Sequence, residues 1–231
     1  MQIKSIQTTL IDYPGHIAAI VFVGGCNFRC DYCYNKELVN HPETQPTLTD
    51  EEIFSYLNGR KNLIEGLVIT GGEPTIQKHL KDFIINVRAL GLKIKLDTNG
   101  YLPSVLKNLL DLNLIDYVAM DVKAPLHKYS EVVGVNINTD KILESINLLK
   151  NGSVAYEFRT TVWDKGFSQQ DFIDIYELVK GAPYYYLQNS YTIPCAGKKY
   201  SYEPMSKKDI LPVVDLGKKY VSKIDLRGSW N

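Results

Sequence analysis

The chain has 231 residues, of which 45% are hydrophobic and 23% are charged, so it is long enough for a substantial core and has the composition of a soluble globular protein. Lysine plus arginine equals aspartate plus glutamate, 26 of each, which argues against nucleic acid or a membrane surface as a partner recognised by bulk charge. No apolar run of about 18 residues and no secretory pattern is present, so we expect a cytoplasmic protein.

Hydrophobic patterns predict an alternation of strands and helices. A short strand and a Pro-Gly turn precede the first core strand, within residues 3–15. Core strands are predicted at 17–23, 66–70, 93–97, 117–121, 154–161 and 184–188. Helices are predicted at 49–57, 76–90, 103–112, 139–150 and 168–180, and the tail adds a helix at 206–219 and a strand at 224–226.

This alternation gives six strand–helix units of a length suited to right-handed crossovers. It predicts an α/β fold with a parallel sheet, either open and doubly wound or curled into a partial barrel. No linker or low-complexity tract interrupts it. We expect a single domain over residues 1–231, with its core at about 15–190 and a C-terminal extension at 191–231.

Three of the four cysteines lie within eight residues, directly after the strand at 17–23: Cys26, Cys30 and Cys33. The loop at the carboxyl end of a core strand is where α/β proteins usually place their chemistry. Thiolates clustered on such a loop indicate a metal or cluster site, and crowded cysteines are typical of a ligand set in a reducing compartment.

Two metal groups remain open for this loop. A structural zinc ion needs a fourth ligand, for which the candidates are His16, His41 and Cys195. A 4Fe–4S cluster held by three thiolates leaves one iron free for a substrate or cofactor. Gaps of three and two residues suit one loop wrapped around a cube-shaped cluster, so the spacing favours the cluster over zinc.

A second motif ends the next strand. Residues 67–70 run straight into the turn Gly71-Gly72-Glu73-Pro74. The two glycines allow the backbone to approach a ligand closely, proline fixes the turn, and Glu73 offers an acceptor at the strand end. Alone, a Gly-Gly turn more often only connects a strand to a helix, but here it accompanies the cysteine motif.

With Tyr32 before the last cysteine, Cys26-x-x-x-Cys30-x-x-Cys33 resembles the signature of the radical S-adenosylmethionine (SAM) enzymes, and Gly71-Gly72-Glu73-Pro74 resembles their motif for the SAM amino group. The resemblance implies a partial (β/α)6 barrel. It also implies that the open iron binds the amine and carboxylate of SAM, and that one electron cleaves SAM into methionine and a 5′-deoxyadenosyl radical.

Two later strand ends resemble those of the glycyl-radical-enzyme activating proteins: Asp97-Thr98-Asn99-Gly100 and Asp121-Val122-Lys123-Ala124-Pro125. Taken alone, they are also ordinary turn sequences. The resemblance implies that Asp97, Thr98 and the segment of Asp121 are associated with a monovalent cation beside the SAM carboxylate, and that Lys123 lines the active site as the catalytic side chain. The resemblance thus assigns cofactor contacts to the following residues: Tyr32, Gly71, Gly72, Glu73, Pro74, Asp97, Thr98, Asp121 and Gln188.

Further stretches look most like the short activating proteins of anaerobic ribonucleoside-triphosphate reductase: 11–15, 156–161 and 186–188. One residue departs from the activases, because Tyr34 follows the third cysteine where they often have histidine. Arg159 is open to two interpretations, as a partner of a ribose or carboxylate or as half of a buried ion pair. Gln188 either bonds the adenine or closes the barrel, and Cys195 is interpreted as an incidental thiol.

The leading hypothesis is an activase that abstracts a hydrogen atom from a glycine of an anaerobic ribonucleotide reductase, with flavodoxin or ferredoxin as electron donor. Two alternatives stay open. One is a radical SAM enzyme that acts on a small molecule, as in 7-carboxy-7-deazaguanine synthase-like enzymes. The other is a non-catalytic zinc or iron–sulfur module.

Overall fold

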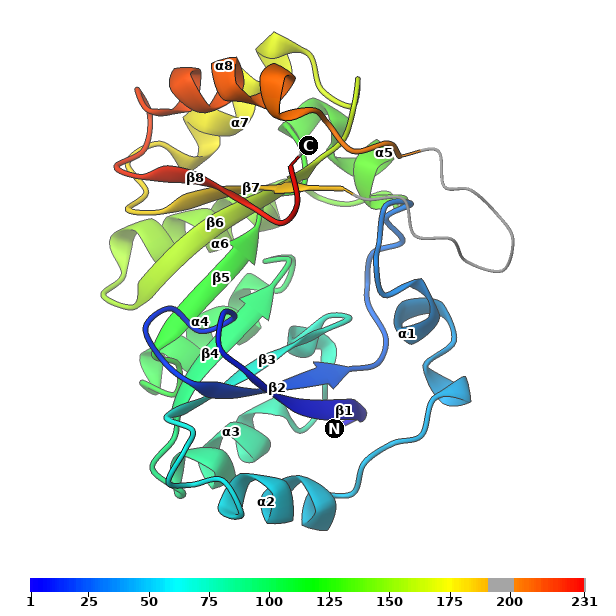
Figure 1. Ribbon diagram of the computed structural model, residues 1–231, viewed down its shortest axis with the longest axis vertical. Helices are drawn as coiled ribbons and strands as arrows, with labels where there is room; N and C mark the ends of the chain where they lie inside the picture. Colours follow the sequence, from blue (N-terminus) through cyan, green and yellow to red (C-terminus); the bar gives the residue numbers. More distant parts are fainter. Residues whose placement is uncertain (191–201, 231) are drawn as a thin grey trace.

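A computed structural model describes residues 1–190 and 202–230 of the chain, so Cys195 lies outside the described residues. One eight-stranded sheet, in the order β1 to β8, organises this part of the molecule. Figure 1 shows it curving from β1 to β8 with most helices on its outer side. The strands are β1 (Ile3–Thr9), β2 (Ala18–Val23), β3 (Gly66–Gly71), β4 (Lys93–Thr98), β5 (Tyr117–Asp121), β6 (Ala155–Val162), β7 (Tyr185–Asn189) and β8 (Ile224–Arg227).

Strands β2 to β8 pair in parallel, and β1 adds an antiparallel edge to β2. β1 and β8 are the two edges of the described sheet, so the curl is that of a partial barrel, as predicted. The six predicted core strands are β2 to β7. The tail contributes more than an appendage, because β8 pairs with β7 and continues the parallel sheet.

Six of the described helices lie close to their predicted positions, and two short ones, at 36–40 and 129–133, were not predicted. They are α1 (Lys36–Asn40), α2 (Asp50–Asn58), α3 (Leu80–Arg88), α4 (Pro103–Asp111), α5 (Tyr129–Val133), α6 (Asp140–Asn151), α7 (Gln169–Val179) and α8 (Lys207–Gly217), with short 3₁₀ turns η1 (Pro42–Thr44), η2 (Pro74–Ile76) and η3 (Leu126–Lys128). Capping boxes at Thr49 and Ser168 begin α2 and α7, since each side chain accepts from the third helical N–H. None of the described helices is both long and apolar enough to cross a membrane.

The predicted helix at 76–90 is wrong at its start, because the helix begins only at Leu80. Glu73 caps the 3₁₀ turn η2 instead, and the chain leaves that turn extended at Gln77. The Gln77 side chain is held by the loop that follows β2, because its Nε2 donates to the Gly24 carbonyl at 2.9 Å. Contacts between segments distant in sequence therefore displace the helix start.

Strand alternation divides the residues of β4, β5 and β6 between two environments. Ile94, Leu96 and Phe158 join the large apolar core, as do Val118 and Met120 of β5. Lys95, Asp97 and Glu157, at the alternate positions, are also buried, although they are charged. The apolar set packs with the outer helices, which leaves the charged set for the inside of the barrel.

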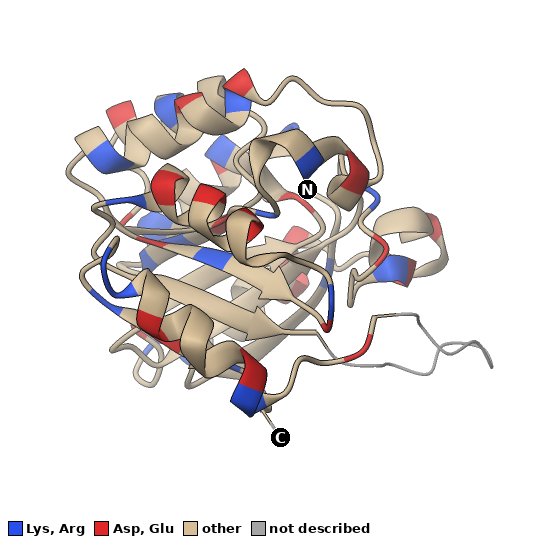
Figure 2. Ribbon diagram, turned by 90° about the horizontal axis from the view of Figure 1, so that it is seen from above, with Lys and Arg blue, Asp and Glu red and all other residues tan. Residues whose placement is uncertain are grey.

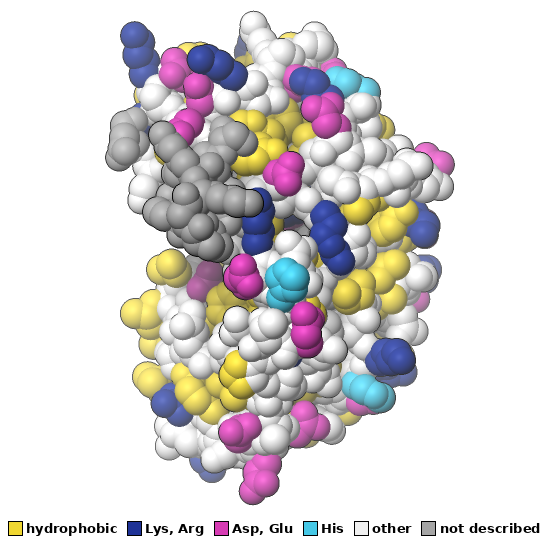
Figure 3. Space-filling view, turned by 90° about the vertical axis from the view of Figure 1, so that its right-hand side faces the viewer, with side chains coloured by type: hydrophobic (Ala, Val, Ile, Leu, Met, Phe, Trp, Pro, Cys, Tyr) yellow, Lys and Arg dark blue, Asp and Glu magenta, His cyan; other side chains and the backbone are white. Residues whose placement is uncertain are grey.

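Charged residues on the outside are mixed. Figure 2 shows Lys and Arg interleaved with Asp and Glu along the outer helices. Figure 3, which views the side where α1 lies, shows hydrophobic side chains among charges of both signs. Neither view shows one charge gathering on a face, in agreement with the balanced composition.

Candidate active site

The cysteine loop and the Gly-Gly-Glu-Pro turn are bonded backbone to backbone. The Gly72 N–H donates to the Val23 carbonyl at 2.8 Å, and the Glu73 N–H donates to the Gly25 carbonyl at 2.9 Å. A Cβ on Gly72 would lie 1.8 Å from the Gly25 oxygen, and Gly71 has φ +115°. The two glycines are therefore required by the approach of one motif to the other.

The thiols are half-buried at the start of this loop. The Phe28 N–H donates to the Cys26 Sγ at 3.3 Å, which orients that sulfur. Burial, aided by the charge of Glu73, raises the pKa of the Cys26 thiol to about 12, and burial also raises the pKa of Cys30. Without a positive metal centre these two thiols hold their protons, so binding a metal or cluster releases them.

Glu73 joins three segments around the thiols. Its carboxylate, 1% exposed, accepts from the Thr75 N–H and hydroxyl at 3.0 and 2.6 Å. It also accepts from the Thr98 hydroxyl and the Asn99 N–H, each at 2.7 Å. Burial raises its pKa, against the opposing effect of these four hydrogen bonds. The motif glutamate thereby ties the turn after β3 to the end of β4.

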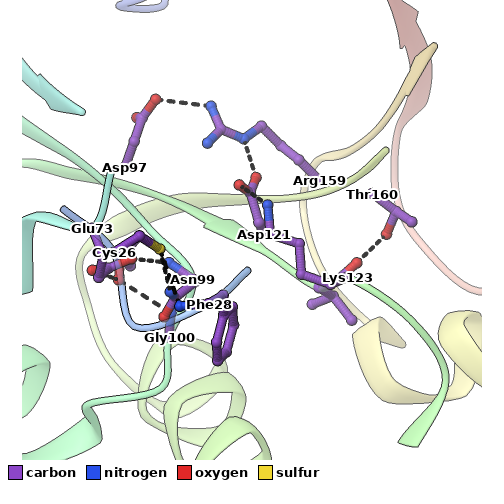
Figure 4. A network of polar contacts seen from close by, with 12 residues as sticks. Cys26, Phe28, Glu73, Asp97, Asn99, Gly100, Asp121, Lys123, Arg159 and Thr160 are labelled. Carbon is purple, nitrogen blue, oxygen red and sulfur yellow. Dashed lines mark hydrogen bonds and ion pairs between the residues drawn. The ribbon is translucent and has the colours of Figure 1, made fainter. Parts of the chain in front are cut away.

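A chain of alternating charges crosses the inside of the barrel from β4 to β6. Arg159 Nη1 lies 2.9 Å from Asp97 Oδ2, and Arg159 Nε lies 2.7 Å from Asp121 Oδ1. Lys95 pairs with the other oxygen of Asp97, and Lys123 Nζ lies 2.8 Å from Asp121 Oδ2. Figure 4 shows the Arg159 guanidinium between the two aspartates, with Lys123 beyond Asp121.

The opposite charges fix the ionisation of this chain. Burial alone would raise the pKa of Asp97 and of Asp121, but the Arg159 charge and the adjacent lysines outweigh it and hold both pKa values below the usual range. Burial would lower the pKa of Arg159 and Lys123, but their carboxylate partners raise both. Asp97, Asp121, Lys123 and Arg159 are therefore charged at neutral pH.

One cavity of about 230 Å³ gathers the predicted site residues. Its walls come from the ends of β3 to β7 and from the cysteine loop. Among the predicted residues it is lined by Cys26, Cys30, Tyr32, Cys33, Gly71, Gly72, Glu73, Asp97, Thr98, Asp121, Lys123 and Gln188. Pro74 is buried at the start of η2 and does not line it.

Several residues of this cavity were not singled out from the sequence, among them Asn99, Asn35 and Thr161. Asn99 Nδ2 donates to Asn27 Oδ1 at 2.7 Å, and Asn35 Nδ2 donates to the Gly71 carbonyl at 3.2 Å. Each holds one motif loop to another. Asn99 was interpreted as a turn former because of the following glycine, so only its position directly after the Asp-Thr pair signalled it.

The cysteine loop also reaches the far side of the barrel. The Tyr32 ring stacks on Trp163, just beyond β6, with centroids 5.0 Å apart. The Tyr34 hydroxyl donates to the Asn189 carbonyl at the end of β7, at 2.6 Å. These contacts span the mouth from the β2 side to the β6 and β7 ends. Tyr34, the residue that departs from the activases, is thus a bridge across the mouth.

The loop fits a 4Fe–4S cluster. Asn27 Nδ2, a buried donor beside the thiols, has no hydrogen-bond partner among residues 1–190 and 202–230, and the buried Tyr32 hydroxyl faces the Cys30 thiol; cluster sulfurs accept bonds from such donors. Within residues 1–190 and 202–230, no three His, Cys, Asp or Glu side chains converge as ligands of a single metal ion. A cube that takes each thiolate on a different iron does not require such convergence.

His16 and His41, the two candidate zinc ligands within the described residues, do not line the cavity that holds the thiols. His16 Nδ1 lies 2.6 Å from Glu65 Oε2, near the amino end of the strands, and His41 is exposed beside Glu43. A larger groove of about 1090 Å³ lies between α4 and α6. No cysteine is among its described lining residues, and the pairs Arg88–Asp116 and Lys107–Asp111 neutralise part of its charge.

The motifs, the fold and the cavity together define a class, and the chain belongs to the radical SAM superfamily, whose family model matches residues 20–179. The chain is 35% identical over 233 residues, covering 96% of this chain and 93% of the other, to a protein of Methanocaldococcus jannaschii that is named as a glycyl-radical enzyme activating enzyme. It is 29% identical over 168 residues, 70% of this chain and 66% of the other, to the pyruvate formate-lyase 1-activating enzyme of Escherichia coli K12.

Solved structures show the same fold. Streptococcus suis SuiB bound to S-adenosylmethionine superposes with a TM-score of 0.70 over 88% of this chain and 48% of that chain, at 16% identity. QueE from Escherichia coli superposes with a TM-score of 0.56 over 98% of this chain and 93% of that chain, at 14% identity. Membership of the superfamily makes the chain an enzyme of radical SAM type and implies a 4Fe–4S cluster and SAM.

Proposed function

We propose that the protein activates a glycyl-radical enzyme by removing a hydrogen atom from one of its glycines. The observation that carries the proposal is the convergence of the three thiols, the Gly-Gly-Glu-Pro turn and the ends of β4 and β5 on one cavity. Similarity to a protein named as a glycyl-radical enzyme activating enzyme over 96% of the chain supports it.

In this proposal Cys26, Cys30 and Cys33 hold the cluster, and the cluster supplies the open iron and the electron. SAM lies in the cavity beside the following residues: Tyr32, Gly71, Gly72, Glu73, Asp97, Thr98, Asp121 and Gln188. Pro74 has an indirect role, because it begins the 3₁₀ turn η2 that Glu73 caps and so fixes the backbone at Glu73. Lys123, held by Asp121 with its ammonium 5.9 Å from the Tyr32 ring centroid, is the catalytic side chain of the proposal.

The reaction uses one electron and one SAM for each glycine activated. The electron breaks the bond between sulfur and C5′, giving methionine and a 5′-deoxyadenosyl radical. That radical takes the hydrogen atom from the glycine Cα, giving 5′-deoxyadenosine and a glycyl radical. The electron comes from a donor of low potential, for which we propose flavodoxin or ferredoxin in the cytoplasm.

For the partner we propose an anaerobic ribonucleotide reductase. The stretches 11–15, 156–161 and 186–188 support it, because they resemble the short activases of that reductase. We also propose that residues 1–231 act as one domain, since β8 continues the sheet beside β7 and α8 contacts α7.

To test the proposal, reduced protein and SAM are mixed with the anaerobic reductase, and the mixture is examined by EPR. A glycyl-radical doublet is expected, and a Cys33→Ala preparation serves as the matched control that yields none. SAM cleavage without a doublet from this reductase refutes the proposed partner. SAM cleavage without a doublet from any glycyl-radical enzyme refutes the activase.

A small-molecule reaction is the second candidate. It is favoured by 32% identity over 93 residues, 40% of this chain, to the 7-carboxy-7-deazaguanine synthase of Hyperthermus butylicus. Formation of 5′-deoxyadenosine that depends on an added small molecule, with no protein partner present, would support it.

A further inference from the structure

Every carboxylate oxygen of Asp97 and Asp121 already has a cationic partner. The two oxygens of Asp97 face Lys95 and Arg159, and the latter distance is 2.9 Å. The two oxygens of Asp121 face Arg159 and Lys123, at 2.7 and 2.8 Å. One guanidinium, with two different nitrogens, therefore lies between the two aspartates (Figure 4).

The third expected cation ligand is engaged as well. The Thr98 hydroxyl donates to Glu73 Oε1 at 2.7 Å and accepts from the Gly100 N–H at 3.1 Å. The residues that the resemblance associates with a monovalent cation are thus satisfied by the protein itself. An added cation would have to displace a buried ion pair, which opposes its binding.

The group is also buried and electrostatically closed. The side chain of Arg159 is 11% exposed, that of Asp97 10% and that of Lys95 1%. A guanidinium is permanently charged and binds carboxylates through a planar fork, so it holds two carboxylates together more rigidly than a hydrated alkali ion does. Arg159 lies on β6, which pairs with β5 so that Arg159 is opposite Asp121, and this register fixes its position along the barrel axis.

We infer that Arg159 takes the place of a monovalent cation between Asp97 and Asp121, so that this protein binds SAM without requiring an alkali cation. Of the three cationic side chains in this group, Arg159 and Lys123 line the cavity. Either can face an anionic group of the bound molecule, such as the SAM carboxylate. The inference rests on the proposed function only for the identity of that molecule.

The first experiment uses the wild-type protein. SAM binding to the cluster-loaded protein is titrated in sodium, potassium and choline chloride at equal ionic strength. The dissociation constant is expected to change less than about twofold, because no alkali ion takes part. A loss of about tenfold in choline, recovered in sodium or potassium, would overturn the inference.

The second experiment exchanges the guanidinium for an uncharged chain of similar length, in Arg159→Met. Removing a charge-assisted contact is expected to weaken SAM binding about tenfold in choline, and sodium or potassium should restore most of it by entering the vacated place. Weak binding in every salt would overturn the inference, since Arg159 would then do something a cation cannot. Arg88→Met, which breaks the distant pair with Asp116, is the matched control and should bind SAM as the wild type does.

The third measurement needs neither cluster nor SAM. In cluster-free protein, exchanging choline for sodium should raise the melting temperature of Arg159→Met but not that of the wild type or Arg88→Met. Stabilisation of the wild type by sodium alone would overturn the inference, even if Arg159→Met fails to fold. If no preparation binds SAM in any salt, the proposed function fails, whereas this melting comparison still decides the role of Arg159.

Discussion

At the scale of single residues, the motif side chains of this site form hydrogen bonds and ion pairs with other residues of the protein. Glu73 accepts four hydrogen bonds from Thr75, Thr98 and Asn99, although its motif was interpreted as an acceptor for the SAM amine. Each bond to an ionised group contributes about 1.5–3 kcal/mol in a buried setting. Its first effect is to fix the relative positions of two strand ends.

Gly72→Ala is expected to unseat the cysteine loop. The added Cβ would lie 1.8 Å from the Gly25 oxygen, and its nearest neighbours are all backbone atoms of Gly25, so the two loops must separate. We expect the free energy of unfolding to fall by more than about 3 kcal/mol and iron binding to be lost. Thermal unfolding and iron content measure both.

The control for that change is Gly91→Ala. Gly91 has φ +82° but open space around its Cβ position, so alanine there costs only about 1 kcal/mol of backbone strain. If Gly72→Ala cost no more stability than Gly91→Ala, the contact between the two motif loops would not matter for folding.

Tyr34→Phe removes the hydroxyl that bonds the Asn189 carbonyl across the mouth. We expect the free energy of unfolding to fall by about 1 kcal/mol, which lowers the melting temperature by about 2–4 °C, while the iron content stays that of the wild type. Tyr202→Phe is the matched control, because its hydroxyl lies 3.5 Å from Asp31 at an exposed site. A melting temperature of Tyr34→Phe equal to that of the control would mean that the bridge does not stabilise the protein.

At the scale of elements, the start of α7 is fixed by a single carboxylate. Asp171 accepts from the Ser168 N–H and hydroxyl, each at 2.8 Å, and from Lys128 Nζ at 2.6 Å. Burial alone would raise its pKa, but the bonds from Lys128 and Ser168 outweigh burial and lower it. The carboxylate therefore joins the helix cap to the 3₁₀ turn η3.

Asp171→Ala is expected to cost about 2 kcal/mol at neutral pH, because the cap and the buried acceptor are both lost. The pKa of Asp171 is lower in the folded protein than in the unfolded chain, where it is about 4. The carboxylate therefore contributes fully to the free energy of unfolding above about pH 4, and this contribution is lost as the pH falls through the pKa of the folded state. Melting temperatures of variant and wild type should therefore converge in acid. A difference that persists unchanged at low pH contradicts this account, and the exposed Asp174→Ala should show little effect at any pH.

The elements were largely predictable where local pattern decides them. The β-branched run of β2 and the capping sequences at Thr49 and Ser168 act within a few residues, and those elements lie where they were predicted. The start of α3 was not predictable, because Gln77 is held by Gly24, 53 positions away. Such a contact leaves no trace in local periodicity.

At the scale of the whole molecule, the parallel order of the strands explains why the site could be predicted in outline. Parallel strands bring their carboxyl ends to one edge, so motifs at the ends of β2, β3, β4 and β5 had to meet there. The pairing of Arg159 with Asp97, 62 positions away, and with Asp121, 38 positions away, depends on the curvature of the sheet. The sequence left Arg159 open between a ligand contact and an ion pair, and the structure contains the ion pair.

The central claim is that a radical derived from SAM in this cavity takes a hydrogen atom from a glycine of a partner protein. The most direct measurement uses partner protein prepared with glycine deuterated at Cα, mixed with reduced protein and SAM, with mass spectrometry of the 5′-deoxyadenosine formed. The account predicts one deuterium in that product for each glycyl radical. Product without deuterium, formed while the partner is present, would contradict the account.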